Sequence, residues 1–413
     1  MFFSKKLKGA PAQKHRVSFN LDFNKTRGAF LKQRNVAKVG DKLFSAFGVI
    51  QSPYTETVDR ALFQIGDYFV ALANGLGVVS YNSGQVLRLA DVTSDSTVSH
   101  VKYQDKIVFS TDSGTYVTDS GDMSERINDN YYTSLATCYS RIFGISGKDI
   151  CMTLAGDISQ WDDSLVINAD TKLDALIALD KLYVLGDTCY TLVPNAEECN
   201  MQFKPFAFNV GAVQAESVTA LGKRAIFAST NGLYKLTSNS ITPIFTQLYD
   251  YVSFDGCVAC EYNGKLCITC KRRDGDMTKN DILLVLDVDR EQIDAVLDVE
   301  AQHIATIDGK LYMVVNNKLC MASDEIVESS YVETVDFHSG DVKYLDKLTV
   351  RTLTDVDIWI DNGREKRRYC VRGKHNVQRL PLAGSGRQFD VVVHAHDGMQ
   401  LDCLELTART YGV

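Results

Sequence analysis

The stretch Asn263-Gly264-Lys265-Leu266-Cys267-Ile268 carries the pattern that decides the fold of this chain. Asn-Gly supplies the positive φ angles that a two-residue hairpin turn requires, and the apolar run after it is typical of a buried β-strand. The same phrase, a turn rich in Asp, Gly or Asn followed by an apolar run, occurs seven times between Phe63 and Ser323. The turns of these copies are anchored at Asp67, Asp105, Ser140, Asp180, Gly222, Gly264 and Gly309.

Successive anchors are 38, 35, 40, 42, 42 and 45 residues apart, which is the period of one blade of a β-propeller. Most copies then carry a second turn and a second apolar run, as in Asn231-Gly232 followed by Leu233-Tyr234-Lys235-Leu236. A single unit cannot bury both of its faces, whereas copies stacked around an axis can. The repeat therefore predicts an all-β chain with a propeller of about seven blades. Six blades and a two-sheet sandwich array are the alternatives.

The repeat ends near Ser323, and the residues after it alternate apolar and polar. Turns at Asp361-Asn362-Gly363 and Gly384-Ser385-Gly386 separate several of these runs, which predicts a C-terminal antiparallel β-sandwich. A chain of 413 residues with 45% apolar residues is long enough for two folded domains. We expect a basic N-terminal arm over residues 1–34, the propeller over 35–328 and the sandwich over 329–413.

Eleven cysteines raise the question of a metal site. Cys257, Cys260, Cys267 and Cys270 have the paired spacing of zinc ligands. If Asn263-Gly264 is the hairpin turn, however, Cys260 faces Cys267 and Cys257 faces Cys270, on opposite faces of the hairpin. Because two separated thiol pairs cannot form one tetrahedral site, we predict free buried cysteines, no metal and no cofactor.

The net charge of −8 is unevenly distributed. Residues 1–34 contain nine Lys or Arg and one acid, and residues 364–379 contain seven Lys or Arg and one acid. Such patches bind phosphate backbones or acidic proteins, and a solvated face with a flexible tail is the alternative. Direct DNA binding is a secondary expectation, because the remainder of the chain is acidic. The candidate assembly residues are Lys5, Lys6, Lys8, Lys14, Arg16, Lys366, Arg367 and Arg368.

No apolar run of the sequence, such as Ile282-Leu283-Leu284-Val285-Leu286, is long enough to cross a bilayer. The start, Met1-Phe2-Phe3, has no apolar stretch of the length that a secretory signal needs. We therefore expect a chain that is made in the cytosol and does not insert into a membrane.

Four short segments of the C-terminal part, together with the propeller, resemble one family. They are Tyr331-x-Glu333-Thr334-x-Asp336-Phe337, Asp357 to Arg364, Arg379-Leu380-Pro381-Leu382 and Leu404-Glu405-Leu406. This layout resembles the tail-hub or packaged-DNA stabilisation proteins of tailed bacteriophages, and the nozzle proteins of short-tailed phages share the propeller theme.

The resemblance implies a structural and non-enzymatic role in the tail or neck of a virion, for a chain made in the host cytoplasm. Copies would form a ring, expected to be six-fold, that joins the portal and adaptor proteins to spike, fibre or tip proteins. The ring would help to retain packaged DNA and could contact DNA in the exit channel. The family has no catalytic motif, so no catalytic residue is implied.

Two other functions remain open. In a receptor- or glycan-binding module, Trp359 would hold a sugar against its aromatic plane. In a sialidase-like glycoside hydrolase, the segment Ser110 to Tyr116 would be an Asp-box, which braces a hairpin turn and performs no chemistry. The acids Asp287 and Asp289 lack the separation of a catalytic pair. His394 and His396 share a strand face without a third metal ligand.

Overall fold

The structure, a computed structural model, describes most of the chain and assigns it to β-strands with two short 3₁₀ helices, η3 (Ala215–Ser217) and η4 (Thr246–Leu248). The described residues are 13–18, 33–34, 36–39, 42–45, 48–52, 57–73, 76–82, 85–93, 97–162, 166–195, 200–273, 275–323, 330–334, 343–382, 384–386, 389–396 and 398–410. Contacts divide the chain into two compact units. One unit comprises Val49–Glu291 and Val299–Ala322, and the other comprises Met1–Gly48, Gln292–Asp298 and Ser323–Val413.

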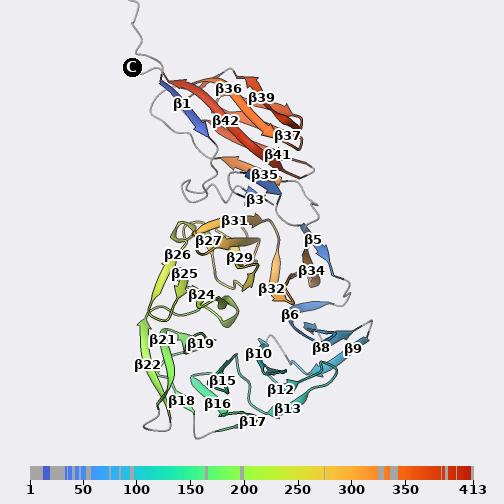
Figure 1. Cartoon of the computed structure of the whole chain (residues 1–413), viewed down its shortest axis with the longest axis vertical. Helices are drawn as coiled ribbons and strands as arrows, with labels where there is room; N and C mark the ends of the chain where they lie inside the picture. Colours follow the sequence, from blue (N-terminus) through green and yellow to red (C-terminus); the bar gives the residue numbers. More distant parts are fainter. Residues whose placement is uncertain are drawn as a thin grey trace, which may run out of the picture. The chain divides into compact units, whose positions relative to one another are not determined.

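The first unit is a β-propeller with seven consecutive blades of antiparallel strands in its described residues; six blades are separate sheets, and the strands of the sixth belong to a 12-stranded sheet. Figure 1 shows these blades following one another around a common centre. The first four blades consist of β6 (Val58–Ile65), β7 (Tyr68–Ala73), β8 (Gly77–Asn82) and β9 (Gln85–Ala90); β10 (Ser99–Tyr103), β11 (Lys106–Thr111), β12 (Gly114–Thr118) and β13 (Glu125–Asn128); β14 (Ser134–Cys138), β15 (Arg141–Ser146), β16 (Asp149–Leu154) and β17 (Asp157–Trp161), with β18 (Ile167–Asn168) on β16; and β19 (Leu173–Ala178), β20 (Leu182–Gly186), β21 (Thr188–Asn195) and β22 (Asn200–Phe208).

The last three blades complete the ring. They consist of β23 (Thr219–Leu221), β24 (Arg224–Ser229), β25 (Gly232–Leu236) and β26 (Ile241–Ile244); β27 (Val252–Ser253), β28 (Ala259–Tyr262), β29 (Lys265–Arg272) and β30 (Ile282–Asp287); and β32 (Ala301–Ile307), β33 (Lys310–Val315), β34 (Lys318–Ser323) and β5 (Gly48–Gln51). The predicted all-β fold with about seven blades is thus confirmed, and seven is the number.

Each predicted turn anchor lies between the first two paired strands of a blade. The turn between β28 and β29 shows the reason, since Asn263 and Gly264 have φ values of 51° and 75°. Positive φ at both central residues matches the twist of the flanking strands. The register then pairs Cys260 with Cys267, as the sequence predicts.

The ring closes with a strand from the beginning of the propeller unit. β5 precedes the first blade in sequence but is the outer strand of the seventh. The Ser52 N–H donates to the carbonyl oxygen of Leu319 at 2.9 Å. Behind this seam, Val58 and Phe69 of the first blade pack with Tyr312 and Leu319 of the seventh in one buried cluster. The first and last blades therefore share both a sheet and a core.

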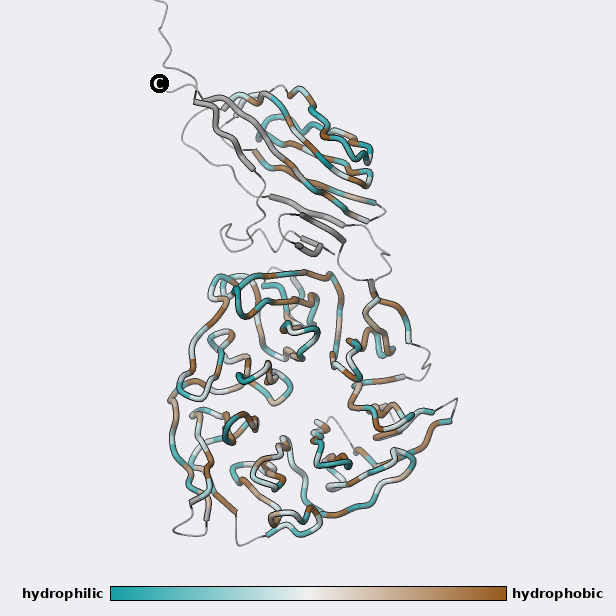
Figure 2. Tube along the Cα trace, in the orientation of Figure 1, coloured by the Kyte–Doolittle hydropathy of each residue, from teal (hydrophilic) through white to brown (hydrophobic). Residues whose placement is uncertain are grey.

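Similar clusters fill the joints between neighbouring blades. Phe109 packs between the first and second blades, Ile142 between the second and third, and Phe143 between the third and fourth. Figure 2 shows hydrophobic and hydrophilic residues alternating along the blade strands. Successive residues of the central strands, as in β20, are buried on both faces, because each blade packs between two neighbours.

The second unit is the predicted β-sandwich. Its strands are β1 (Gln13–Ser18), β2 (Gln33–Arg34), β3 (Val36–Val39), β4 (Lys42–Ser45), β31 (Gln292–Leu297), β35 (Ser330–Thr334), β36 (Lys343–Thr352), β37 (Val356–Asp361), β38 (Lys366–Val371), β39 (Lys374–Pro381), β40 (Ser385–Gly386), β41 (Asp390–Ala395) and β42 (Gln400–Thr410). One sheet has the order β2-β35-β41-β37-β38, and the other contains β3-β4-β42-β36-β39. Leu348, Ile358 and Val391 are fully buried in the core that they share.

Part of the predicted N-terminal arm belongs to this sandwich. β1 pairs with β42, from Gln13 opposite Thr410 to Ser18 opposite Glu405, and β2 pairs with β35. The long β42 offers these main-chain groups a partner, because it extends beyond the part that pairs with β4. Within the predicted basic arm, residues 13–18 and 33–34 are therefore paired strands.

Candidate functional site

Three of the candidate assembly residues lie together on one strand of the sandwich. Lys366, Arg367 and Arg368 are exposed on β38, which is the last strand of its sheet. Lys14 and Arg16 lie in β1, whereas Lys5, Lys6 and Lys8 lie outside the described residues. We name the exposed basic residues of β38 and of the chain that follows it, Lys366, Arg367, Arg368, Arg372, Lys374 and Arg379, the basic edge.

The local sequence builds this edge. The turn before β38 is held by Asn362, whose side-chain oxygen accepts hydrogen bonds from the N–H groups of Arg364 and Glu365, both at 2.9 Å. After β38, the chain turns sharply at Gly373, where a Cβ atom would lie 2.3 Å from the carbonyl oxygen of Leu353. Only glycine fits at such an approach. The turn passes the chain from β38, the last strand of one sheet, to β39, the last strand of the other.

Arg368 is fixed by two contacts within the sandwich. One guanidinium nitrogen lies 2.6 Å from Oδ2 of Asp357, and the guanidinium carbon lies 5.5 Å from the centre of the Trp359 ring. Lys366 has no ion-pair partner in the described part of the chain, and Arg367 pairs with Glu365, two residues away, at 2.7 Å. Arg368 is therefore a positioned charge, whereas Lys366 and Arg367 remain available to a partner.

The Trp359 ring bears on the glycan-binding alternative. The guanidinium of Arg368 covers one face of the indole, and the ring is only partly exposed. A sugar would need an open aromatic face in order to stack. This contact leaves less of the indole for that purpose.

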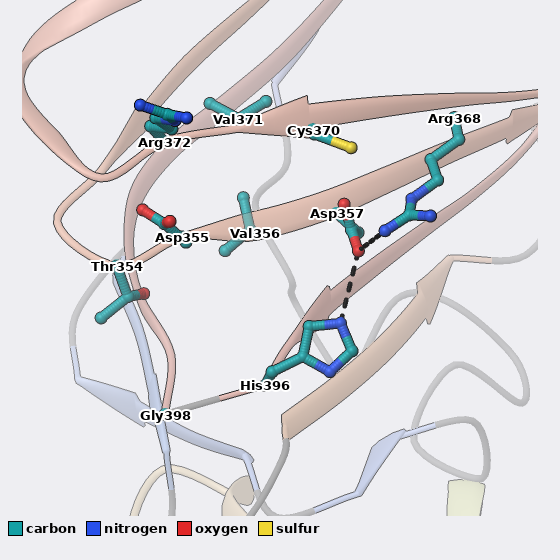
Figure 3. Close-up of a pocket in the computed structure, with 10 residues that line it drawn as sticks. All are labelled: Thr354, Asp355, Val356, Asp357, Arg368, Cys370, Val371, Arg372, His396 and Gly398. Carbon is teal, nitrogen blue, oxygen red and sulfur yellow. Dashed lines mark hydrogen bonds and ion pairs between the residues drawn. The ribbon is translucent and has the colours of Figure 1, made fainter.

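A pocket of about 480 Å³ lies beside Arg368. Figure 3 shows Asp357 between Arg368 and His396, with Cys370 on the neighbouring strand. His396 Nε2 lies 3.3 Å from Asp357 Oδ2. The hydrogen bond from Arg368, aided by Cys370 and His396, lowers the pKa of the Asp357 carboxyl to about 2. The carboxylate is thus ionised and neutralises Arg368 over the physiological range.

Asp, His and Cys side chains together invite comparison with a thiol hydrolase, but their arrangement does not suit that chemistry. A catalytic histidine must lie between the nucleophile and the carboxylate, so that it can take the thiol proton. Here Asp357 occupies the central position, and its hydrogen bond raises the pKa of the Cys370 thiol. A nucleophilic cysteine needs the opposite shift.

A second hollow of about 500 Å³ runs between β38 and the end of β39. Arg367 and Arg368 line its basic side, and Tyr369, Pro381 and Leu382 form its apolar floor. Val377, which lies on β39, is a large apolar side chain that is 50% exposed. The edge therefore combines positive charge with an apolar groove, which is the composition of a protein-docking surface.

The axial channel of the propeller holds a polar cluster that was not predicted from the sequence. A cavity of about 390 Å³ is lined by residues from all seven blades. Arg60 of β6 forms an ion pair with Glu216 of η3, and His100 of β10 and His303 of β32 line the same cavity. Desolvation inside the channel lowers the pKa of His100, whose side chain is exposed to the channel, to about 4 and that of His303, next to Arg60, to about 3.

A signal for these residues exists in the sequence. Arg60, His100 and His303 each stand four to six residues before the first hairpin turn of a blade, which places them on the innermost strand. Ring geometry brings such positions together from distant parts of the chain, and pairwise spacing cannot show this.

The other predicted features have structural roles. Asp112 of the Asp-box accepts a hydrogen bond from the Thr93 N–H at 3.1 Å, which braces the turn as predicted. Asp287 pairs with Lys265, and Asp289 pairs with Arg224 at 2.5 Å. The four clustered cysteines are buried and free. Within the described ranges, no group of three or more His, Cys, Asp or Glu side chains has the arrangement of a metal site.

No helix in the described part of the chain is long and apolar enough to span a membrane.

Comparisons with known proteins identify no family and no function for this chain. No protein-family model matches the chain, and no curated protein matches its sequence. Similar solved structures include BamB from Moraxella catarrhalis, with 12% identity, a TM-score of 0.43, and coverage of 76% of this chain and 98% of that one. PorZ from Porphyromonas gingivalis shows 10% identity and a TM-score of 0.46, covering 78% of this chain and 46% of that one.

The Pan2 WD40 domain from Neurospora crassa shows 9% identity and a TM-score of 0.44, covering 70% of this chain and 98% of that one. Likeness at this level carries no argument about partners or activity. The chain is a β-propeller protein with a β-sandwich.

Proposed function

We propose that this protein is a non-enzymatic structural component of the tail or neck of a tailed phage, in which copies form a ring. The observation that carries the proposal is the basic edge, an exposed strand with cationic side chains beside an apolar groove. Cationic side chains beside an apolar groove are typical of surfaces that bind proteins. The segments that resemble phage tail-hub proteins support it, because Asp357 to Arg364 forms β37 and the turn that leads into this edge.

Charge favours a protein partner over nucleic acid. Residues 35–328 contain sixteen more acids than bases, so the propeller repels phosphate, whereas an acidic protein surface is attracted to the basic edge. The partners in this proposal are other copies, the portal and adaptor proteins, and the spike, fibre or tip proteins.

Purified particles test the proposal directly. Mass spectrometry should find the chain in virions, and electron microscopy of particles labelled with an antibody against it should show label around the tail axis. Absence of the chain from purified virions would refute the proposed role. A glycoside panel and a glycan array with the isolated protein should give no turnover and no binding, and a positive result in either would favour the corresponding alternative.

A further inference from the structure

The propeller also has a sheet edge that carries unusual side chains. β13 is the outermost strand of the second blade, and an edge strand presents unpaired main-chain groups that can take another strand. The acids Asp119, Asp122, Glu125 and Asp129, on and beside this strand, are all exposed. We name these four residues the acidic edge. Arg126, which pairs with Asp129 at 2.9 Å, is the one base among residues 119–129.

An ordered turn in the acidic edge presents a large apolar side chain to solvent. Met123 is 68% exposed. The Thr118 hydroxyl accepts a hydrogen bond from the Gly121 N–H at 2.9 Å and donates one to the Met123 carbonyl oxygen at 2.7 Å. A Cβ atom at Gly121 would lie 2.7 Å from the Ile65 side chain, so the turn packs closely against the first blade. Met123 is therefore held outward by the fold.

The two edges complement each other in three respects. Each is a strand at the end of a sheet. One carries an excess of acids, and the other carries the basic excess of residues 364–379. The acidic edge projects Met123, and the basic edge has a groove with a floor of Tyr369, Pro381 and Leu382. Methionine is flexible and fills irregular apolar gaps.

We propose that β38 of one copy docks on β13 of a second copy, with Met123 in the groove beside Arg367. The contact joins two different surfaces of the same chain, so each copy offers one edge to each of two neighbours. A heterologous contact of this kind closes into a ring when its rotation divides a full turn. The inference rests on the proposed function, because it identifies the contact that a ring requires.

The size of the contact determines its behaviour. β38 has six residues and β13 has four, so the contact area is below the roughly 800 Å² per partner of a stable complex. A single contact should be weak, and a ring, in which every copy makes two contacts, should be more stable. Because the attraction is between exposed charges, association should weaken as salt shortens the Debye length from about 10 Å at 0.1 M to about 3 Å at 1 M.

Sedimentation velocity of the full chain over a range of concentrations, at low and high salt, tests the contact. One variant carries Lys366→Glu and Arg367→Glu, and a second carries Asp122→Lys and Glu125→Lys. Each should weaken self-association at least about tenfold, because two attractive pairs become repulsive. An equimolar mixture of the two variants should restore association, because each β38 then meets a β13 of opposite charge on the other variant, and a chain with all four changes should associate as the unmodified chain does.

Matched controls keep the change of charge and move it elsewhere. Asp170→Lys with Asp250→Lys, and Lys106→Glu with Lys310→Glu, reverse exposed residues outside both edges, and they should leave association unchanged. Arg368 is left intact in every variant, because it pairs with Asp357. Circular dichroism should show the same β spectrum for all chains.

Three outcomes would overturn the inference. The edge variants could associate as strongly as the unmodified chain, which refutes this contact and leaves the proposed ring open to another one. Both edge variants could be monomeric without restoration in the mixture or in the fourfold variant, which means that the edges do not meet. The unmodified chain could stay monomeric at low salt, which refutes self-docking, while the presence of the chain in virions still decides the proposed function.

Discussion

The two histidines of the axial channel predict how the stability of the propeller depends on pH. In the folded chain, the pKa values of His100 and His303 are about 4 and about 3, compared with an ordinary value of 6.5. Between pH 6.5 and the lowered pKa values, the unfolded chain therefore binds more protons than the folded chain. The free energy of unfolding is at its full value above pH 6.5 and falls as the pH drops toward 4 and 3.

The size of this effect follows from the same values. Each histidine that stays neutral in the folded chain lowers the free energy of unfolding by up to about 1.4 kcal/mol for every pH unit below 6.5, which is about 2 kcal/mol at pH 5. His100 is exposed to the channel and His303 is partly exposed, so water screens part of the cost, and we expect about 1 kcal/mol for each. Replacement of His303 by Gln should reduce the loss between pH 7 and pH 5 by that amount.

The two tryptophans make the measurement specific to the propeller. Trp161 stacks on Tyr132 in the propeller, with ring centres 4.3 Å apart, and Trp359 lies in the sandwich. In a Trp359→Phe background, the fluorescence of Trp161 during urea unfolding reports the propeller. His303→Gln, His100→Gln and the double variant are compared at pH 7 and pH 5, with His375→Gln, an exposed position on β39, as the control. Identical losses in all chains would refute the reasoning.

Three further predictions concern stability. Gly211→Ala should destabilise the propeller by at least about 3 kcal/mol, because the added Cβ would lie 1.3 Å from the Gly186 carbonyl oxygen. Gly264→Ala has open space around its Cβ and should lower the free energy of unfolding by only about 1 kcal/mol, through backbone strain. Urea unfolding followed by Trp161 fluorescence separates them, and equal losses would contradict the clash. Glu216→Gln should cost about 3 kcal/mol by leaving Arg60 unpaired, and adding Arg60→Met should recover part of it; a double-mutant cycle with no coupling would count against the pair. Asp357→Asn should lower the urea midpoint for unfolding of the sandwich, and the difference in midpoint from the unmodified chain should vanish as the pH falls from 3.8 to about 2. Trp359 fluorescence in a Trp161→Phe background measures this midpoint. An unchanged midpoint at pH 7 would show that the ion pair with Arg368 adds no stability.

Local chemistry allowed the blades to be predicted from the sequence. Turns such as Asn263-Gly264 impose their geometry on neighbouring residues, so that seven anchors, the strand pairs around them and the opposition of Cys260 and Cys267 all follow from short segments. The position of β38 also follows, because the Asp361-Asn362-Gly363 turn precedes it directly.

Pairing between strands that are distant in the chain could not be predicted from the sequence. β5 completes a blade whose other strands begin at Ala301, and β1 finds its partner in β42. The sequence of neither short strand identifies the strand with which it pairs, because the edge of a sheet can pair with any extended segment of suitable register. The pairing of Arg60 with Glu216 likewise depends on the closed ring. The engagement of Arg368 with Asp357 was missed because the basic run was interpreted by charge alone.

The seam between β5 and β34 has a consequence for biosynthesis. Ser52 and Leu319, which it joins, are 267 residues apart in the chain. At about 5 to 20 residues per second, the ribosome adds Leu319 roughly 13 to 53 seconds after Ser52. Throughout that interval the first blade has an uncovered flank, with Val58 and Phe69 awaiting Tyr312. Nascent chains of this protein should therefore depend on holding chaperones until translation of the seventh blade is finished.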